Sequence, residues 1–144
     1  MEKSQIFDPL RKKDVALTPE EGVRQWFIGV LHKQCGIPLH MMRSEVAFRF
    51  GEEIGVLAGT SRKLYRADIV VYDRSLKPML SVECKRPEVA IDASVAEQAM
   101  RYNYVLNVRW LVLTNGKTTY VYKKNGQSFE PCPAIPSYEE MMAD

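Results

Sequence analysis

Acidic and basic side chains interrupt two apolar stretches of the chain, with types and spacing that suit phosphodiester chemistry. The segment "SVECKRP" places Glu83 and Lys85 directly after an apolar run. Side chains alternate along a strand, so these two share one face. Asp68 interrupts a second apolar stretch, "ADIVV", and an aspartate buried in a strand needs a partner, a cation or an edge. Two carboxylates can bind Mg²⁺, which prefers oxygen ligands and keeps waters, and a lysine can stabilise charge developing on a phosphate.

These charges also have a purely structural interpretation. An acid and a lysine two residues apart occur together by chance in many chains of ordinary composition, so the tripeptide alone carries little information. An ion pair of Asp68 with Lys85 or with Arg86 at a strand edge would account for the charges without a metal. Both interpretations remain open until the surrounding elements are considered.

A helix that begins after Thr18 comes before these stretches. Thr18 is a candidate N-cap, Pro19 suits the first helical position, and Glu21 completes a T-x-x-E capping box. The segment "CGIP" at 35–38 ends the helix. Apolar residues that would form its buried face follow at helical spacing: Val23, Trp26, Phe27, Val30 and Leu31.

From Ser44 onward the apolar period changes to two, which is typical of strands. The pattern predicts strands at 44–50, 64–73 and 79–85, then a helix capped by Asp92 or Ser94 and ending near Asn107, then strands at 109–114 and 115–124. This order, α-β-β-β-α-β-β, indicates an α/β fold with a central mixed sheet, in which the second helix is a crossover connection to the Trp110 strand.

Two groups of residues resemble a known family. The segment "RADIVVYD", followed by "VECKRP", resembles the Asp…Glu-x-Lys core of the PD-(D/E)xK, or restriction-endonuclease-like, superfamily, although Ala67 stands where that superfamily often has proline. The segment "EQAMRYNYVLNVRWLVLTNG" resembles the Q-x-x-x-Y helix and the following strand of the N-terminal nuclease domain in type I restriction enzyme R subunits. Together with "TPEEGVRQWF", the matches span roughly residues 18–122.

The resemblance implies a restriction-endonuclease-like three-layer α/β/α fold and a role for each matched residue. Asp68 and Glu83 would bind Mg²⁺ or Mn²⁺, and Lys85 would assist the attack on the phosphodiester. Gln98, Tyr102 and Arg86 would contact the substrate or brace the site. The superfamily often has a further acid on the first helix, and we expect this to be Glu20, because the capping box accounts for Glu21.

The resemblance also implies a domain organisation and partners. We expect a polar leader at 1–17, a nuclease-like domain at 18–124 and a proline-punctuated tail at 125–144. The segment "GVLAGTSRK" lacks the order of a phosphate-binding loop, so an ATP-driven translocase would be a separate polypeptide, as would specificity and methylation subunits. The expected substrate is DNA, and the alternative is a binding or assembly module with the same fold that does not cleave.

Composition limits the setting in which the chain would act. A net charge of +2 on 144 residues means that affinity for nucleic acid has to come from a local patch. Three widely spaced cysteines and the absence of a long apolar segment indicate a reducing cytoplasm and no membrane insertion. Of the cysteines, Cys84 would face away from the acidic residues. The candidate basic rim of the site comprises Lys33, Arg62, Lys63, Arg66, Lys85, Arg86 and Arg101.

Overall fold

The computed structural model describes residues 4–50 and 63–144. Its elements, in chain order, are β1 (Gln5–Asp8), β2 (Lys13–Ala16), α1 (Pro19–Lys33), a short 3₁₀ helix (Leu39–Met41), β3 (Met42–Phe50), β4 (Lys63–Tyr72), β5 (Pro78–Cys84), α2 (Ala93–Leu106), β6 (Trp110–Thr114), β7 (Thr119–Asn125), β8 (Ser128–Cys132) and α3 (Tyr138–Ala143). The expected order of two helices and five strands is confirmed, with additional elements at both ends. The segment 55–63, tested as a phosphate-binding loop, lies almost wholly outside the described residues.

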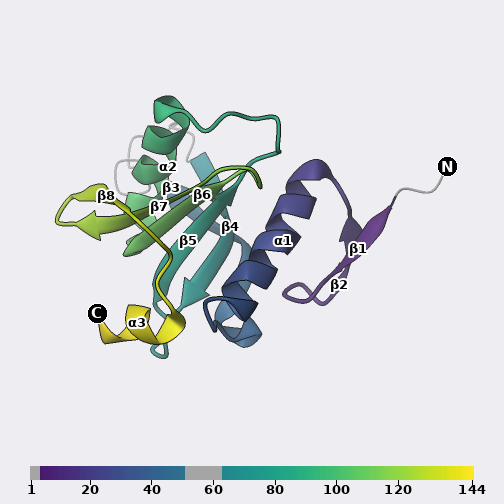
Figure 1. Ribbon diagram of the computed structural model, residues 1–144, viewed down its shortest axis with the longest axis horizontal. Coiled ribbons are helices and arrows are strands. Elements are labelled where there is room, and N and C mark those ends of the chain that lie inside the picture. Colours follow the sequence, from purple (N-terminus) through teal and green to yellow (C-terminus); the bar gives the residue numbers. More distant parts are fainter. Residues whose placement is uncertain (1–3, 51–62) are drawn as a thin grey trace, which may run out of the picture.

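Six strands form one mixed sheet in the order β3-β4-β5-β6-β7-β8 (Figure 1). Strands β5 and β6 are parallel, with Val82 opposite Val112, and the other neighbouring pairs are antiparallel. A parallel pair requires a crossover connection, and α2 provides it. The prediction of a crossover helix before Trp110 is therefore confirmed.

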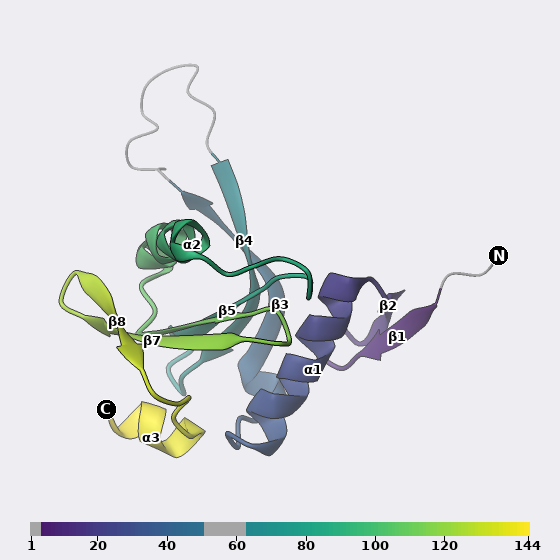
Figure 2. The same cartoon turned by 45° about the horizontal axis from the view of Figure 1, so that its top comes forward.

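Helices cover both faces of this sheet, which gives three layers (Figure 2). Phe27 and Leu31 of α1 belong to the larger core with Val82 and other residues from one face of the sheet. On the opposite face, Ala99 of α2 packs with Leu111 and Leu113. The alternation of side chains along β6 thus contributes to both cores, and the three-layer α/β/α class is confirmed.

Helix α1 begins as the sequence indicates but buries a different face. The Thr18 side chain accepts a hydrogen bond from the Glu21 amide at 3.1 Å. In a full capping box the Glu21 carboxylate would accept a hydrogen bond from the Thr18 amide. Here the Thr18 amide donates to the Ala16 carbonyl instead, and the Glu21 carboxylate accepts from Arg11. Trp26, expected on the buried face, is 49% exposed. The buried side of α1 instead includes Glu21 and Arg24, so a charged patch lies between helix and sheet.

Residues 5–16, within the segment expected to be a polar leader, form a β-hairpin. Its two short strands pair with Phe7 opposite Asp14. Asp8 has no exposed surface, and its carboxylate accepts hydrogen bonds from Arg11 and from the Leu10 amide. Burial acts to raise the pKa of Asp8, but these hydrogen bonds outweigh it, so the pKa lies below its ordinary value. Arg11 also donates to Glu21 on α1 at 2.7 Å, which attaches the hairpin to the domain.

We expect replacement of Arg11 by methionine to lower the free energy of unfolding by about 2 kcal/mol, because the buried Asp8 and Glu21 carboxylates lose a shared cation. Urea unfolding at pH 7 measures the change. Lys13→Met, at an exposed position of the same hairpin, is the matched control and should change stability by less than about 0.5 kcal/mol. Equal free energies of unfolding for the two variants would show that the ion pairs of Arg11 contribute nothing to the stability of the domain.

The tail at 125–144 completes the sheet and covers one end of the core. Strand β8 pairs with β7, and the short final helix α3 begins with a capping box between Ser137 and Glu140. Tyr138 is buried, and its hydroxyl donates to the Tyr72 carbonyl at 3.0 Å. Met141 is fully buried in the larger core. None of the helices in the described residues is long and apolar enough to span a membrane.

Candidate active site

Asp68 and Glu83 are the first residues beyond the paired stretch of β4 and β5, where the two strands diverge. The two strands pair from Tyr72 and Pro78 as far as Ile69 and Val82, and Asp68 is the next residue of β4. Instead of continuing the ladder, its Oδ2 accepts a hydrogen bond from the Cys84 amide at 2.7 Å. The carboxylate thus fills the gap between the strands.

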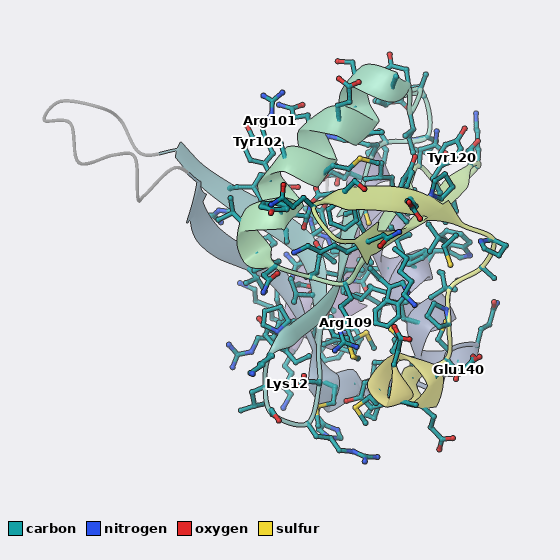
Figure 3. The ribbon with its side chains drawn as sticks, turned by 90° about the vertical axis from the view of Figure 1, so that its left-hand side faces the viewer. Lys12, Arg101, Tyr102, Arg109, Tyr120 and Glu140 are labelled. Atoms are coloured by element: carbon teal, nitrogen blue, oxygen red, sulfur yellow. The ribbon has the colours of Figure 1, made fainter. Side chains whose placement is uncertain are left out.

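A cavity of about 270 Å³ adjoins this point and contains four of the expected site residues. It is lined by Tyr65, Glu83, Lys85, Val95, Gln98, Ala99 and Tyr102. Glu83 and Lys85 share the strand face toward α2, as their spacing predicts. Gln98 and Tyr102, one helical turn apart on α2, face them (Figure 3 labels Tyr102 beside Arg101). The Tyr102 ring stacks on Tyr65 of β4, with centroids 4.3 Å apart.

The other three expected site residues, Asp68, Arg86 and Glu20, are not among the residues that line this cavity. Arg86 is 56% exposed and pairs with Glu88 at 3.4 Å. Glu20, on the first turn of α1, is half-buried, and its negative charge raises the pKa values of both Asp68 and Glu83. Cys84 belongs to the larger core on the opposite face of the sheet, as its alternation with Glu83 predicts.

Burial dominates the protonation of the two acids. Loss of solvent raises the pKa of Asp68 to about 6, although the Cys84 amide and Arg24 both act to lower it. Glu83 is only 6% exposed, and burial raises its pKa to about 8, partly offset by the Asn103 amide and by the charge of Lys85. Its buried Oε1 has no hydrogen-bond partner among the described residues. Glu83 therefore has a buried acceptor oxygen that no donor in the described residues satisfies.

Arg24, which the sequence did not indicate, provides the cation nearest to Asp68. Its Nη2 donates to Asp68 Oδ1 at 3.2 Å, and its Nη1 donates to Glu45 Oε1 at 3.1 Å. Glu45 of β3 stands opposite Asp68 in the strand register and has a φ of 53°. A left-handed conformation is unfavourable for glutamate and is common at functional sites. Arg24 lies three residues before Phe27 on the apolar stripe of α1, which is the one local signal of its burial.

The residues at this point fit a magnesium ion held by few protein ligands. Mg²⁺ commonly binds one or two carboxylates and fills its other positions with water and substrate phosphate. Asp68, Glu83 with its unsatisfied Oε1, and the Cys84 carbonyl are suitable oxygen ligands. Within residues 4–50 and 63–144, no group of three or more histidine, cysteine, aspartate or glutamate side chains could hold a metal. A site here would thus depend on the two carboxylates.

The expected basic rim is only partly near the cavity. Arg66 and Arg101 are exposed on β4 and α2, the two elements that border it. Lys33 ends α1, nine residues beyond Arg24, or about 14 Å along the helix. Arg62 and the side chain of Lys63 lie outside the described residues. Among the described residues of the expected rim, only Lys85 lines the cavity, whereas Arg101 lines a separate hollow on another side of α2.

The "LTNG" segment, part of the family resemblance, forms a turn that anchors the loop after β5. The Asn115 amide donates to the Val89 carbonyl at 2.8 Å, while its Oδ1 accepts from the amides of Lys117 and Thr118. Gly116 has a φ of 88°, which favours glycine. The Asn115–Val89 hydrogen bond therefore fixes the position of the loop that follows Lys85.

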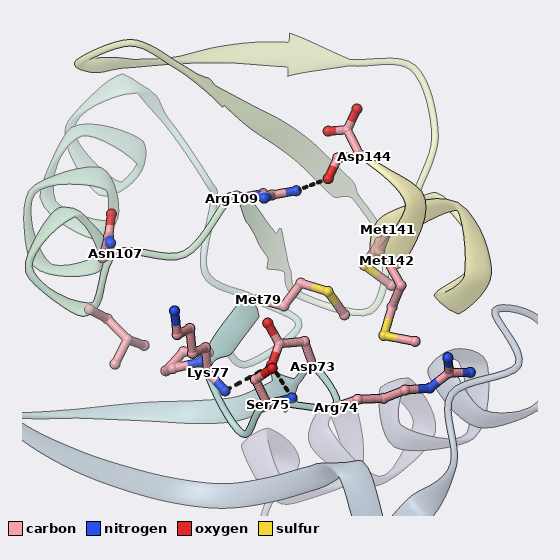
Figure 4. Close-up of a pocket in the computed structure, with 12 residues that line it drawn as sticks. Asp73, Arg74, Ser75, Lys77, Met79, Asn107, Arg109, Met141, Met142 and Asp144 are labelled. Carbon is pink, nitrogen blue, oxygen red and sulfur yellow. Dashed lines mark hydrogen bonds between the residues drawn. The ribbon is translucent and has the colours of Figure 1, made fainter.

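A larger cavity, of about 540 Å³, lies at the opposite end of β5 (Figure 4). It is bordered by the β4–β5 turn, the end of α2 and α3. Asp73 accepts hydrogen bonds from the amides of Ser75 and Lys77 in that turn, and Arg109 donates to the Asp144 main chain. None of the expected site residues lines it, so the smaller cavity remains the candidate active site.

The fold and the site together define an α/β domain with a carboxylate pair and a lysine at the diverging ends of two central strands. The chain belongs to the family described as type I restriction enzyme R protein N terminus, whose model matches residues 19–136. It is also similar in fold to the fragment structure of a putative HsdR subunit of a type I restriction enzyme from Vibrio vulnificus YJ016, with a TM-score of 0.63 and 19% identity. That similarity covers 88% of this chain and 25% of the other. Comparison with curated proteins gives no match.

Proposed function

We propose that this domain is a Mg²⁺-dependent nuclease that hydrolyses phosphodiester bonds of DNA in the cytoplasm. The observation that carries the proposal is the position of Asp68 and Glu83 on neighbouring strands at the point where β4 and β5 diverge, with Lys85 beside Glu83 in the adjoining cavity. Family membership supports it, because the chain corresponds to the N-terminal part of an R protein. A purely structural role explains the site less well, since Lys85 forms no ion pair with Asp68 or Glu83, all three of which lie in the described part of the chain.

In this proposal, Asp68 and Glu83 hold Mg²⁺ or Mn²⁺, and the Cys84 carbonyl provides a further oxygen. The bound metal would supply positive charge at the scissile phosphate and lower the pKa of a water molecule. Lys85 stabilises the negative charge that grows on the phosphate oxygens during attack. Gln98 and Tyr102 line the same cavity and orient the DNA backbone or the lysine.

The partners follow from the family. The chain spans a quarter of the HsdR fragment that it resembles. We infer that an ATP-dependent translocase moves DNA past this domain, and that specificity and methylation subunits of a restriction enzyme select the DNA. Arg66 of β4 and Arg101 of α2 are exposed and would contact phosphates of the moving duplex.

Cleavage of supercoiled and linear DNA at high protein concentration, with Mg²⁺ or Mn²⁺ and in parallel with EDTA, tests the proposal. We expect metal-dependent cleavage that Asp68→Asn abolishes, because this change removes the charge from a metal ligand. Glu88→Gln, at an exposed position in the loop after β5, is the control and should cleave normally. Cleavage that persists in EDTA or in Asp68→Asn would contradict the proposal.

A second candidate function is DNA binding or complex assembly without cleavage. It is favoured by the contact between Arg24 and Asp68 Oδ1, which places a cation where a metal would bind. Salt-sensitive retardation of DNA with no cleavage under any metal condition would select this alternative.

A further inference from the structure

Arg24 is a buried cation that the proposed chemistry leaves unexplained. Its side chain is 6% exposed and lies on α1 against the fork between β4 and β5. Besides its contacts with Asp68 and Glu45, its Nη1 is 3.6 Å from Glu21 Oε1. The buried Nε has no hydrogen-bond partner among the described residues. The guanidinium therefore contacts three carboxylates, and its Nε–H still has no acceptor among the described residues.

The guanidinium holds the Asp68 oxygen that a metal would need. Oδ2 of Asp68 accepts from the Cys84 amide at 2.7 Å, which ties that oxygen to β5. Oδ1 is left for a cation, and Arg24 occupies it at 3.2 Å. Two cations that share one carboxylate oxygen repel each other strongly in a site of low solvent content. A metal on Asp68 and the Arg24–Asp68 contact are therefore antagonistic.

A second position for the guanidinium is already formed. The left-handed backbone at Glu45 directs its carboxylate toward α1, where it accepts from Arg24 at 3.1 Å. Arg11 steadies this arrangement, because it contacts Glu45 at 3.4 Å and donates to Glu21 at 2.7 Å. When Arg24 releases Asp68, its charge stays paired with Glu45 and Glu21, so release does not leave a buried cation uncompensated.

We propose that Arg24 is an internal counterion that competes with the divalent metal for Asp68 and moves to Glu45 and Glu21 when the metal binds. The inference rests on the proposed metal site. It assigns Arg24 a positioning role: the residue neutralises Asp68 in the metal-free protein and sets the metal concentration at which the site fills.

Calorimetric titration of the full chain with Mn²⁺, without DNA, tests the competition. Arg24→Gln removes the charge but keeps a hydrogen-bond donor, and we expect it to bind Mn²⁺ about tenfold more tightly than the parent. Arg24→Lys retains the charge and should bind within about twofold of the parent. We also expect saturating Mn²⁺ to raise the thermal unfolding midpoint of Arg24→Gln more than that of the parent.

The outcomes separate this inference from the proposed function. Metal binding by the parent with equal or weaker binding by Arg24→Gln would overturn the competition and leave the metal site standing. Binding by neither protein would overturn both.

If Arg24→Gln does not fold, Glu45→Gln provides the second variant. It weakens the alternative position of Arg24 and should lower Mn²⁺ affinity several-fold, whereas an affinity equal to that of the Glu88→Gln control would overturn the inference.

Discussion

Replacing Lys85 by methionine is expected to reduce DNA cleavage by about 1000-fold while leaving the folded state intact. The lysine is placed beside Glu83 in the candidate cavity, where its ammonium can stabilise charge that develops on the attacked phosphate. Removal of one preorganised stabilising group typically costs 100-fold to 1000-fold in rate. Methionine is unbranched like the apolar stem of lysine and lacks only its terminal amine, so packing along β5 is preserved. Initial rates of plasmid cleavage at saturating Mn²⁺ measure the loss.

The structural interpretation of Lys85 makes the opposite prediction. If Lys85 mainly compensated a buried carboxylate, Lys85→Met would lower the thermal unfolding midpoint clearly. We expect a change within about 2 °C, because no ion pair joins Lys85 to either acid within the described residues. Lys77→Met, at an exposed position near the other end of β5, controls for the general loss of a positive charge. A large drop in the midpoint with unaltered cleavage would contradict the catalytic role.

The core of the fold could be predicted because its signals are local. Alternation of apolar residues marks β4 and β5, and a continuous apolar run marks β6. Asp92 accepts a hydrogen bond from the Val95 amide at 3.0 Å, as the capping pattern before α2 indicates. The same alternation correctly places Glu83 and Lys85 toward one cavity and Cys84 in the opposite core.

The charge network behind Asp68 could not be predicted, because its members come from four separate segments. Arg24 reaches Glu45 across 21 positions and Asp68 across 44 positions of the chain. Each charge, taken alone, is compatible with an exposed surface. The sequence assigned Glu21 to a capping box, whereas its carboxylate instead bonds Arg11 and Gln25 and lies near Arg24.

The N-terminal hairpin and the exposed Trp26 show two further limits. The hairpin strands are four residues long, and their attachment to the domain depends on the ion pair of Arg11 with Glu21 and on Leu10, without an apolar periodicity to mark it. The apolar residues of α1 are spaced over a wide arc, so periodicity alone does not say which edge is buried. The structure buries the edge that contains Arg24 and leaves Trp26 exposed, which puts charge rather than an indole ring beside Asp68.

Replacing Glu83 by glutamine is expected to change the pH dependence of stability. Burial raises the pKa of Glu83 to about 8, whereas in the unfolded chain it returns to about 4.3. At a pH between these two pKa values, Glu83 is protonated in the folded protein and ionised in the unfolded protein, so the folded protein binds one more proton. The contribution of the protonated Glu83 is therefore complete below pH 4 and is lost as pH rises through 8. Glutamine does not titrate, so the variant lacks this loss.

We expect the free energy of unfolding of Glu83→Gln, relative to the parent, to increase by about 4 kcal/mol between pH 5 and pH 9. Urea unfolding of both proteins in EDTA at several pH values measures it, and Glu88→Gln, whose carboxylate is 61% exposed, should follow the parent throughout. Parallel curves for Glu83→Gln and the parent would show that Glu83 ionises normally. Because a divalent cation favours the ionised carboxylate, added Mn²⁺ should flatten the curve of the parent and leave that of Glu83→Gln unchanged. This difference would connect the burial of Glu83 directly to its use as a metal ligand.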